Sequence, residues 1–156
     1  MTILTTITVD QLQNMQGKKI GISPWIQLPQ SMLNQFADIT NDHQFIHVDT
    51  ERAGTESPFG GTIAHGFLTL SQLTQMAEST LPVIKGVRMS INYGFDRIRF
   101  ITPVRSDARV RAHFTLEHAE ERTAGEWTLH HDISVEIEHH GRPALSALWI
   151  TRQYTG

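Results

Sequence analysis

The chain has 156 residues, of which 39% are hydrophobic and 19% are charged, a composition that is ordinary for one globular domain. Its formal net charge is −3 and its 13 basic residues are scattered, which argues against a nucleic-acid-binding protein. It has no cysteine, so disulfides and thiolate metal sites are excluded. There is no signal-peptide pattern and no apolar run of membrane-spanning length, so we expect a cytoplasmic protein without membrane insertion.

The first half of the chain is typical of helices joined by loops. Thr8 and Gln11 form a capping-box pattern, and the apolar residues that follow recur at helical spacing. Residues 18–28 are typical of an edge or bulged strand, because their Ile and Trp content is combined with an internal proline. Apolar positions predict a second helix over residues 30–40, followed by an irregular polar stretch over 41–62.

The strongest helical pattern covers residues 66–79, where apolar side chains form one stripe and Pro82 lies just past the end. After Pro82 the apolar period changes to two, which predicts antiparallel strands with one face on a core. The alternating segments are residues 87–93, 108–116 and 127–137, and a turn at His140-Gly141 predicts a final strand around 144–151. One apolar helix before a long antiparallel sheet favours an α+β fold, with residues 1–156 in a single domain.

Asp42 and His47 lie five residues apart, just after the helix predicted over residues 30–40. A loop can bring this carboxylate and imidazole together, and such a pair supplies an acid and a base near neutral pH. Two other interpretations stay open: a turn cap beside an ordinary surface histidine, or a metal site formed with His43. The metal site is the weaker one, because the spacing lacks the glutamate of the zinc-protease helix motif.

A glycine-bearing loop leads directly into the strongest predicted helix at Gly66. The first N–H groups of a helix are unpaired and carry a partial positive charge, so the N–H of Gly66 could stabilise an oxyanion. A glycine also allows close approach of the backbone. The alternative is that these glycines only form a turn, and His65, at or near the N-cap, is more consistent with a structural role.

Together these segments resemble the MaoC-like (R)-specific enoyl-CoA hydratases, and more closely their NodN-like branch. Three motifs in order carry the resemblance, which covers about residues 25–150: DHQFIH at 42–47, IAHGF at 63–67 and NYGFDRIRF at 92–100. The general family pattern has Asn-Pro where this chain has Gln44 and Phe45. That departure keeps the acid–base pair. It changes the side-chain amide that binds water in the family, from Asn to Gln44, and it affects the expected acyl-chain preference.

The resemblance implies a hot-dog fold, in which an antiparallel sheet wraps around a central helix, and a homodimer whose sheets join. It implies reversible hydration of trans-2-enoyl-CoA to (3R)-3-hydroxyacyl-CoA. Asp42 would be the principal base, His47 its partner, and the Gly66 N–H the group that polarises the thioester carbonyl. Further substrate-binding residues are expected at Gln44, His65, Asn92, Arg97 and Arg99. We expect no metal and no organic cofactor, because the base, the proton and the oxyanion donor all come from the chain.

Two other functions stay open. A hot-dog acyl-CoA thioesterase resembles this arrangement, but such enzymes place a catalytic acid on the central helix. Residues 67–79 hold a single carboxylate, Glu78, at the far end, which argues against thioester hydrolysis. A non-catalytic acyl-binding protein would use the site for recognition only, which leaves the presence of both Asp42 and His47 unexplained.

Overall fold

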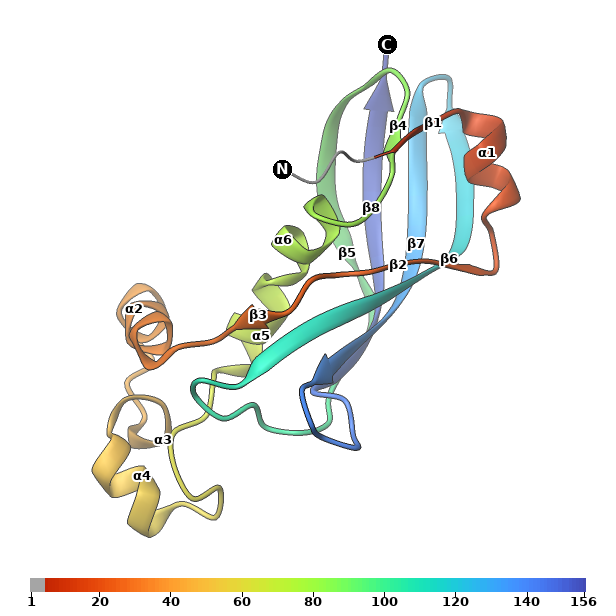
Figure 1. Cartoon of the computed structure of the whole chain (residues 1–156). Helices are drawn as coiled ribbons and strands as arrows, with labels where there is room; N and C mark the ends of the chain where they lie inside the picture. The colour runs from red at the N-terminus through yellow and green to blue at the C-terminus, as the bar shows by residue number, and fades with distance from the viewer. Residues whose placement is uncertain (1–4) are drawn as a thin grey trace.

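The computed structural model describes residues 5–156, in which one antiparallel sheet curls around a pair of consecutive helices (Figure 1). The strand order is β2-β6-β7-β8-β5, with β3 also paired to β6. These strands are β2 (Lys18–Ile22), β3 (Ile26–Gln27), β5 (Val87–Phe100), β6 (Arg109–Thr123), β7 (Glu126–Ile137) and β8 (Leu145–Thr155). Two short parallel strands, β1 (Thr6–Ile7) and β4 (Val83–Ile84), form a separate small sheet.

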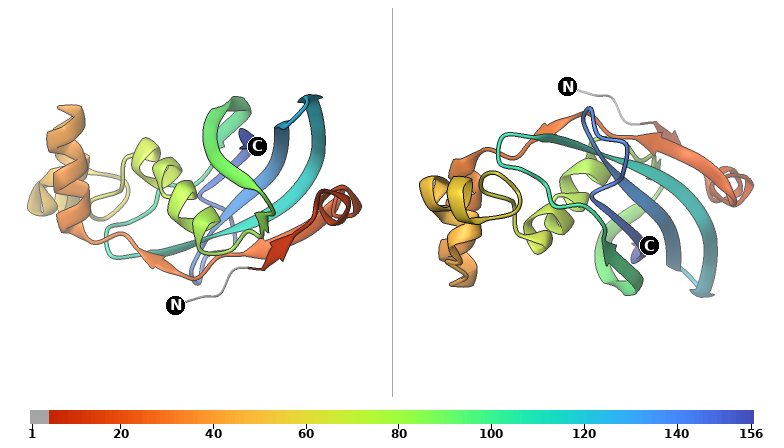
Figure 2. Two further views of the ribbon diagram at one scale, coloured as in Figure 1. Left: turned by 90° about the horizontal axis from the view of Figure 1, so that it is seen from above. Right: turned by 90° about the horizontal axis from the view of Figure 1, so that it is seen from below.

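Five of the helices form two groups, and α1 lies apart from both (Figures 1 and 2). The six helices of the described chain are α1 (Val9–Asn14), α2 (Gln30–Thr40), α3 (Phe45–Val48), α4 (Thr50–Glu56), α5 (Gly66–Ser71) and α6 (Leu73–Glu78). Figure 2 shows that the sheet curves around α5 and α6, while α2, α3 and α4 gather beyond one end of the sheet. This arrangement confirms the predicted α+β class. The prediction of one domain over residues 1–156 stays a prediction, and residues 1–4 lie outside the described range.

Two helix predictions need correction. The stretch over residues 41–62, predicted to be irregular, contains α3 and α4. Helix α4 is capped by Asp49, whose carboxylate accepts a hydrogen bond from the Arg52 N–H at 2.9 Å. The single helix predicted over residues 66–79 is divided at Gln72. The Ser71 hydroxyl donates to the Leu68 carbonyl at 2.7 Å and so competes for the acceptor that a continuous helix would offer to Gln72.

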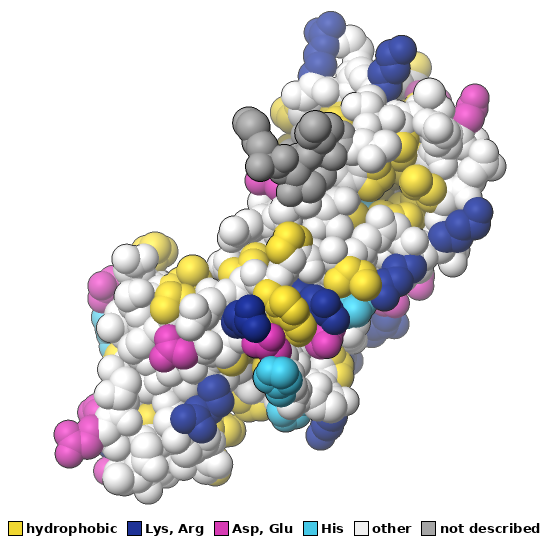
Figure 3. Space-filling model, viewed as in Figure 1, with side chains coloured by type: hydrophobic (Ala, Val, Ile, Leu, Met, Phe, Trp, Pro, Cys, Tyr) yellow, Lys and Arg dark blue, Asp and Glu magenta, His cyan; other side chains and the backbone are white. Residues whose placement is uncertain are grey.

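The core lies between α5–α6 and the inner faces of β6, β7 and β8. Leu68, Leu73 and Met76 of the helices are at most 2% exposed. They belong to the same core as the inward-facing residues Val110, Ala112, Phe114, Ile133, Val135, Leu145 and Ala147. The predicted alternation of β6 and β7 is therefore confirmed. Among the described residues, no helix is long and apolar enough to cross a membrane. On the described part of the face shown in Figure 3, basic and acidic side chains are interspersed.

Strand β5, at the edge of the sheet, departs from the predicted alternation. The apolar residues that follow Val87 are expected on the core face, but three of them are exposed: Met89 50%, Ile91 39% and Tyr93 55%. The register with β8 shifts between Val87 and Met89, and a one-residue slip turns the side chains that follow to the opposite face, up to the next shift between Asn92 and Gly94. Ser90 and Asn92 consequently line cavities beside the helices.

The buried His131 on β7 makes the stability of the protein depend on pH. Burial in an apolar environment, which disfavours the imidazolium, and to a lesser extent the neighbouring His130 together lower its pKa to about 4. Between the unfolded pKa near 6.5 and the folded value, the unfolded chain takes up a proton that the folded chain does not, so stability falls as the pH falls. We expect this residue to lower the free energy of unfolding by roughly 2 kcal/mol between pH 7 and pH 5.

Urea unfolding of the protein and of the His131→Leu variant at both pH values measures this effect. The variant should lose that part of the pH dependence. An identical pH dependence in the two proteins would contradict the prediction.

Candidate active site

Asp42, His47 and His65 converge where α2, α3 and α5 meet. One oxygen or nitrogen atom of each side chain lies within 4.8 Å of those of the other two. Helix α2 ends at Asn41, whose φ of 55° is left-handed, and the Asp42 N–H donates to the Ala37 carbonyl at 3.1 Å. This C-terminal turn and the short helix α3 bring Asp42 and His47 together, as the sequence pattern predicts.

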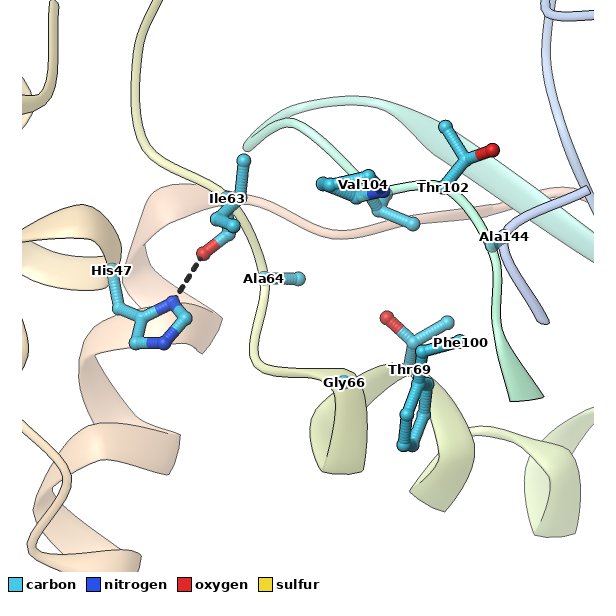
Figure 4. Close-up of a pocket in the computed structure, with 10 residues that line it drawn as sticks. His47, Ile63, Ala64, Gly66, Thr69, Phe100, Thr102, Val104 and Ala144 are labelled. Atoms are coloured by element: carbon cyan, nitrogen blue, oxygen red, sulfur yellow. Dashed lines mark hydrogen bonds between the residues drawn. The ribbon is translucent and has the colours of Figure 1, made fainter. Parts of the chain in front are cut away.

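His47 is a buried base with a defined tautomer. Its Nδ1 lies 2.7 Å from the Ile63 carbonyl oxygen (Figure 4), and because a carbonyl only accepts, Nδ1 carries the proton. The Nε2 atom of the neutral ring therefore keeps its lone pair. The pKa of His47 lies below its usual value, mainly because the ring is buried. The hydrogen bond to Ile63 raises the pKa, the neighbouring His65 lowers it, and the charge of Asp42 raises it. The neutral form is thus favoured near pH 7.

His65 positions the carboxylate. It is the N-cap of α5, is 4% exposed, and its ring stacks on that of His47 with centroids 3.7 Å apart. Its Nε2 donates to the backbone carbonyl of Asp42 at 3.0 Å and lies 3.8 Å from a carboxylate oxygen of the same residue. The Asp42 side chain is 41% exposed, so water can reach it. The structural role considered for His65 therefore agrees with its contacts.

The arrangement favours acid–base chemistry over metal binding. His43, the third member of the metal site considered from the sequence, lies outside the cluster, 3.8 Å from Asp38. His47 and His65 each commit one ring nitrogen to a carbonyl oxygen. If both carbonyl bonds are kept, each ring has only one nitrogen left for an ion, so these two histidines and Asp42 would supply at most three ligand atoms, one per residue.

Two residues that the sequence did not single out hold His47 in place. The Gln30 side-chain amide donates to the His47 backbone carbonyl at 2.8 Å. The Thr62 hydroxyl donates to Gln30 Oε1 at 2.5 Å. In addition, the Ile63 N–H donates to the Ile46 carbonyl at 2.9 Å. Nothing in the spacing of Gln30 signals this role, because the contact spans 17 residues and exists only in the folded chain.

A cavity of about 250 Å³ lies between His47 and the start of α5. Its walls are largely apolar and include Phe100, and Figure 4 shows Thr69 and Phe100 close to Gly66. Gly66 is the first residue of α5, and its N–H has no hydrogen-bond partner within residues 5–156. Thr102 also lines the cavity, and its buried hydroxyl is without a partner there. The cavity thus combines a base with unpaired hydrogen-bonding groups.

The other residues predicted to bind substrate are dispersed. Gln44 is exposed at the N-cap of α3, with its N–H 3.4 Å from Asp42 Oδ1. Asn92 lines a separate cavity beside α5 and α6. Arg97 and Arg99 flank the inward-packed Ile98, so they lie on the outer face of the sheet, away from the His47 cavity. Substrate contacts by these residues stay a prediction.

Comparison with known proteins identifies the relatives of this chain. The MaoC-like domain model matches residues 11–136. Nodulation protein N of Rhizobium meliloti is 49% identical over 144 residues, covering 92% of this chain and 89% of that protein. The 3-hydroxyacyl-thioester dehydratase Z of Mycobacterium tuberculosis is 42% identical over 145 residues, covering 93% and 95%.

A solved structure with the same fold is the (R)-hydratase from A. caviae involved in PHA biosynthesis. Its TM-score is 0.66 at 22% identity, with 87% of this chain and 97% of that chain covered. The curled sheet around α5 and α6 is therefore a hot-dog fold. The chain belongs to the MaoC-like dehydratase family, as the three sequence motifs indicate.

The contacts of Gln30 can be tested without a substrate. Gln30→Leu leaves the His47 carbonyl without its side-chain partner, while the Thr62 hydroxyl keeps its contact with Ser106 Oγ at 3.0 Å, so we expect the free energy of unfolding to fall by about 1–3 kcal/mol. Asn34→Leu removes only the exposed hydrogen bond between Gln30 and Asn34, and this variant should change the free energy of unfolding by less than about 0.5 kcal/mol. Urea unfolding compares the two, and equal losses would show that Gln30 does not hold the site.

Proposed function

We propose that this protein reversibly adds water to trans-2-enoyl-CoA thioesters to give (3R)-3-hydroxyacyl-CoA. One observation carries the proposal: His47 and the unpaired N–H of Gly66 line one cavity, and Asp42 lies beside His47. The 42% identical relative named as a 3-hydroxyacyl-thioester dehydratase supports the same class of reaction.

The proposed mechanism uses Asp42 and His47 as one unit. Water is held between the Asp42 carboxylate and the lone pair of His47 Nε2. As its oxygen bonds to C3 of the substrate, Asp42 takes its proton and the electron pair moves to the thioester oxygen. The N–H of Gly66 stabilises the resulting enolate oxygen. When the enolate collapses, the Asp42–His47 pair returns the proton to C2 and is restored.

No external group is needed in this scheme. The carboxylate, the imidazole and the helix N–H supply the base, the proton and the oxyanion donor, so we propose that the enzyme uses neither metal nor organic cofactor. Hydrolysis of the thioester is disfavoured, because Glu78 is exposed at the end of α6. At the helical rise of 1.5 Å per residue it lies roughly 18 Å from Gly66.

The first functional prediction concerns the acid–base pair. Asp42→Asn and His47→Gln should each lower the hydration rate by at least ~10²-fold, because each removes a group that accepts or returns the proton. The double variant should lose little more than either single variant. His43→Gln is a matched control, since this exposed histidine lies outside the cluster and should keep its activity. Absorbance of crotonyl-CoA and of a longer enoyl-CoA follows turnover, and near-normal rates in either single variant would refute the mechanism.

The oxyanion donor is tested by comparing Gly66→Pro with Gly66→Ala. Proline removes the N–H but is tolerated at the first helical position, and the extended ψ of 137° at His65 suits a following proline. Both substitutions add a Cβ that approaches the Phe100 ring to about 3.0 Å, so steric effects are shared. We expect proline to lower kcat by about 10²–10³-fold relative to alanine. Equal losses, with unchanged circular dichroism, would mean that crowding alone is responsible.

We also propose a homodimer formed through β5. The outer face of this edge strand exposes the apolar side chains of Met89, Ile91 and Tyr93, and edge strands with apolar surface favour association. Light scattering at micromolar concentration should give twice the chain mass of 17.6 kDa. Ile91→Lys should weaken the dimer, while Ile39→Lys, at an 82% exposed position on α2, should leave it intact. A native mass of 17.6 kDa would contradict the proposal.

A further inference from the structure

A second cavity, of about 230 Å³, lies at the far end of α6 from His47. Its apolar walls come from α6 and from the segment through β4, and include Ala77, Leu81 and Ile84. Its remaining wall is the inner face of the sheet, where Ser90, His131, Trp149, Thr151 and Gln153 line it. We call this cavity the distal chamber.

The sheet wall of the distal chamber is polar where the rest of the inner face is apolar. Cross-strand pairing brings the polar residues together: His131 is opposite Trp149, Thr151 is opposite Asn92, and Gln153 is opposite Ser90. The register shift in β5 turns Ser90 and Asn92 to this face. The same irregularity that exposes apolar side chains on the outside therefore builds a polar surface on the inside.

Three polar atoms at this wall have no hydrogen-bond partner within the described chain. They are His131 Nδ1, Trp149 Nε1 and Thr151 Oγ1, and all three residues are at most 5% exposed. A buried polar atom without a partner costs roughly 1–3 kcal/mol, and each such atom in a native protein calls for an explanation. A ligand that supplies the missing partners would recover that cost.

The chemistry of these groups selects the kind of ligand. The indole N–H only donates and a threonine hydroxyl can donate, so the bound group must present an acceptor, which means an oxygen atom. His131 is neutral at neutral pH because burial lowers its pKa to about 4. Among residues 5–156, the one charged side chain that lines the chamber is Glu78, which would repel a carboxylate or a phosphate. The chamber therefore suits a neutral oxygen group, such as a hydroxyl or a ketone.

Shared and neighbouring lining residues link the chamber to the candidate active site. A third cavity, of about 190 Å³, lies between α5–α6 and β5 and is lined by Phe67, Leu70, Phe95 and Trp149, among others. Trp149 lines both this cavity and the distal chamber. At the other end, the Phe67 ring contacts the ring of Phe100, 5.9 Å between centroids, and Phe100 lines the His47 cavity. The three cavities thus follow one another along the helices.

We propose that the substrate is a long-chain acyl thioester that carries a neutral oxygen substituent far from the thioester, and that the distal chamber binds this substituent. The acyl chain lies along α5 and α6, with its apolar part against Phe67, Leu70 and Phe95. Trp149 and Thr151 donate hydrogen bonds to the distal oxygen. This inference rests on the proposed function for the position of the thioester.

The test is equilibrium binding of two saturated ligands of equal length, palmitoyl-CoA and its ω-hydroxy derivative. We expect the protein to bind the hydroxy derivative about tenfold more tightly, as two additional hydrogen bonds would allow. Thr151→Val and Trp149→Phe should each bring the affinities for the two ligands close together, so that most of this preference is lost. Thr128→Val is a matched control, because Thr128 is also buried with an unpaired hydroxyl but faces away from the chamber.

The outcomes separate this inference from the proposed function. Saturated ligands cannot be hydrated, so the preference is measured whether or not the protein turns over an enoyl-CoA. Equal affinity for both ligands in the unaltered protein, or a preference that both chamber variants keep, would overturn the inference. Failure to hydrate any enoyl-CoA, with the preference intact, would refute the hydratase proposal and leave the chamber as an acyl-recognition site.

Discussion

The hydrogen bond from His47 Nδ1 to the Ile63 carbonyl oxygen joins the two sequence segments that form the candidate active site. It fixes the tautomer of the ring, so the lone pair lies on Nε2. Ile63 is only three residues before Gly66, so the same bond sets the position of the base relative to the start of α5. The bonds from Gln30 to His47 and from Thr62 to Gln30 run alongside it and join α2 to the same junction.

A second constraint is the register of β5 on β8. An edge strand with an unbroken register would place Met89, Ile91 and Tyr93 on the core face and Ser90 and Asn92 outside. The shift after Val87 reverses both sets at once. The register shift in β5 therefore creates two surfaces. The outer face of the strand is apolar and suited to association, and its inner face is polar and suited to binding a ligand. The two surfaces of β5 are coupled, because a substitution that restored the register would alter both.

Much of the site could be predicted from the sequence because its parts are local. Asp42 and His47 are five residues apart, and the turn that brings them together follows directly from the end of α2. Gly66 begins a helix that is evident from its apolar stripe, and His65 is its N-cap as expected. The strands β6 and β7 show their period of two because each has one face on the core.

What the sequence alone determined is the set of chemical groups, their local spacing and the α+β class, since these follow from short-range periodicity and capping. Only the tertiary structure decided that His65 and not His43 joins the cluster, that Gln30 holds His47, and that Arg97 and Arg99 lie on the outer face of the sheet. The physical reason is that these outcomes depend on contacts across many residues and on strand register. A bulge, which has no clear signature in sequence periodicity, reverses the face of the residues beyond it until the next shift, and β5 has three such shifts.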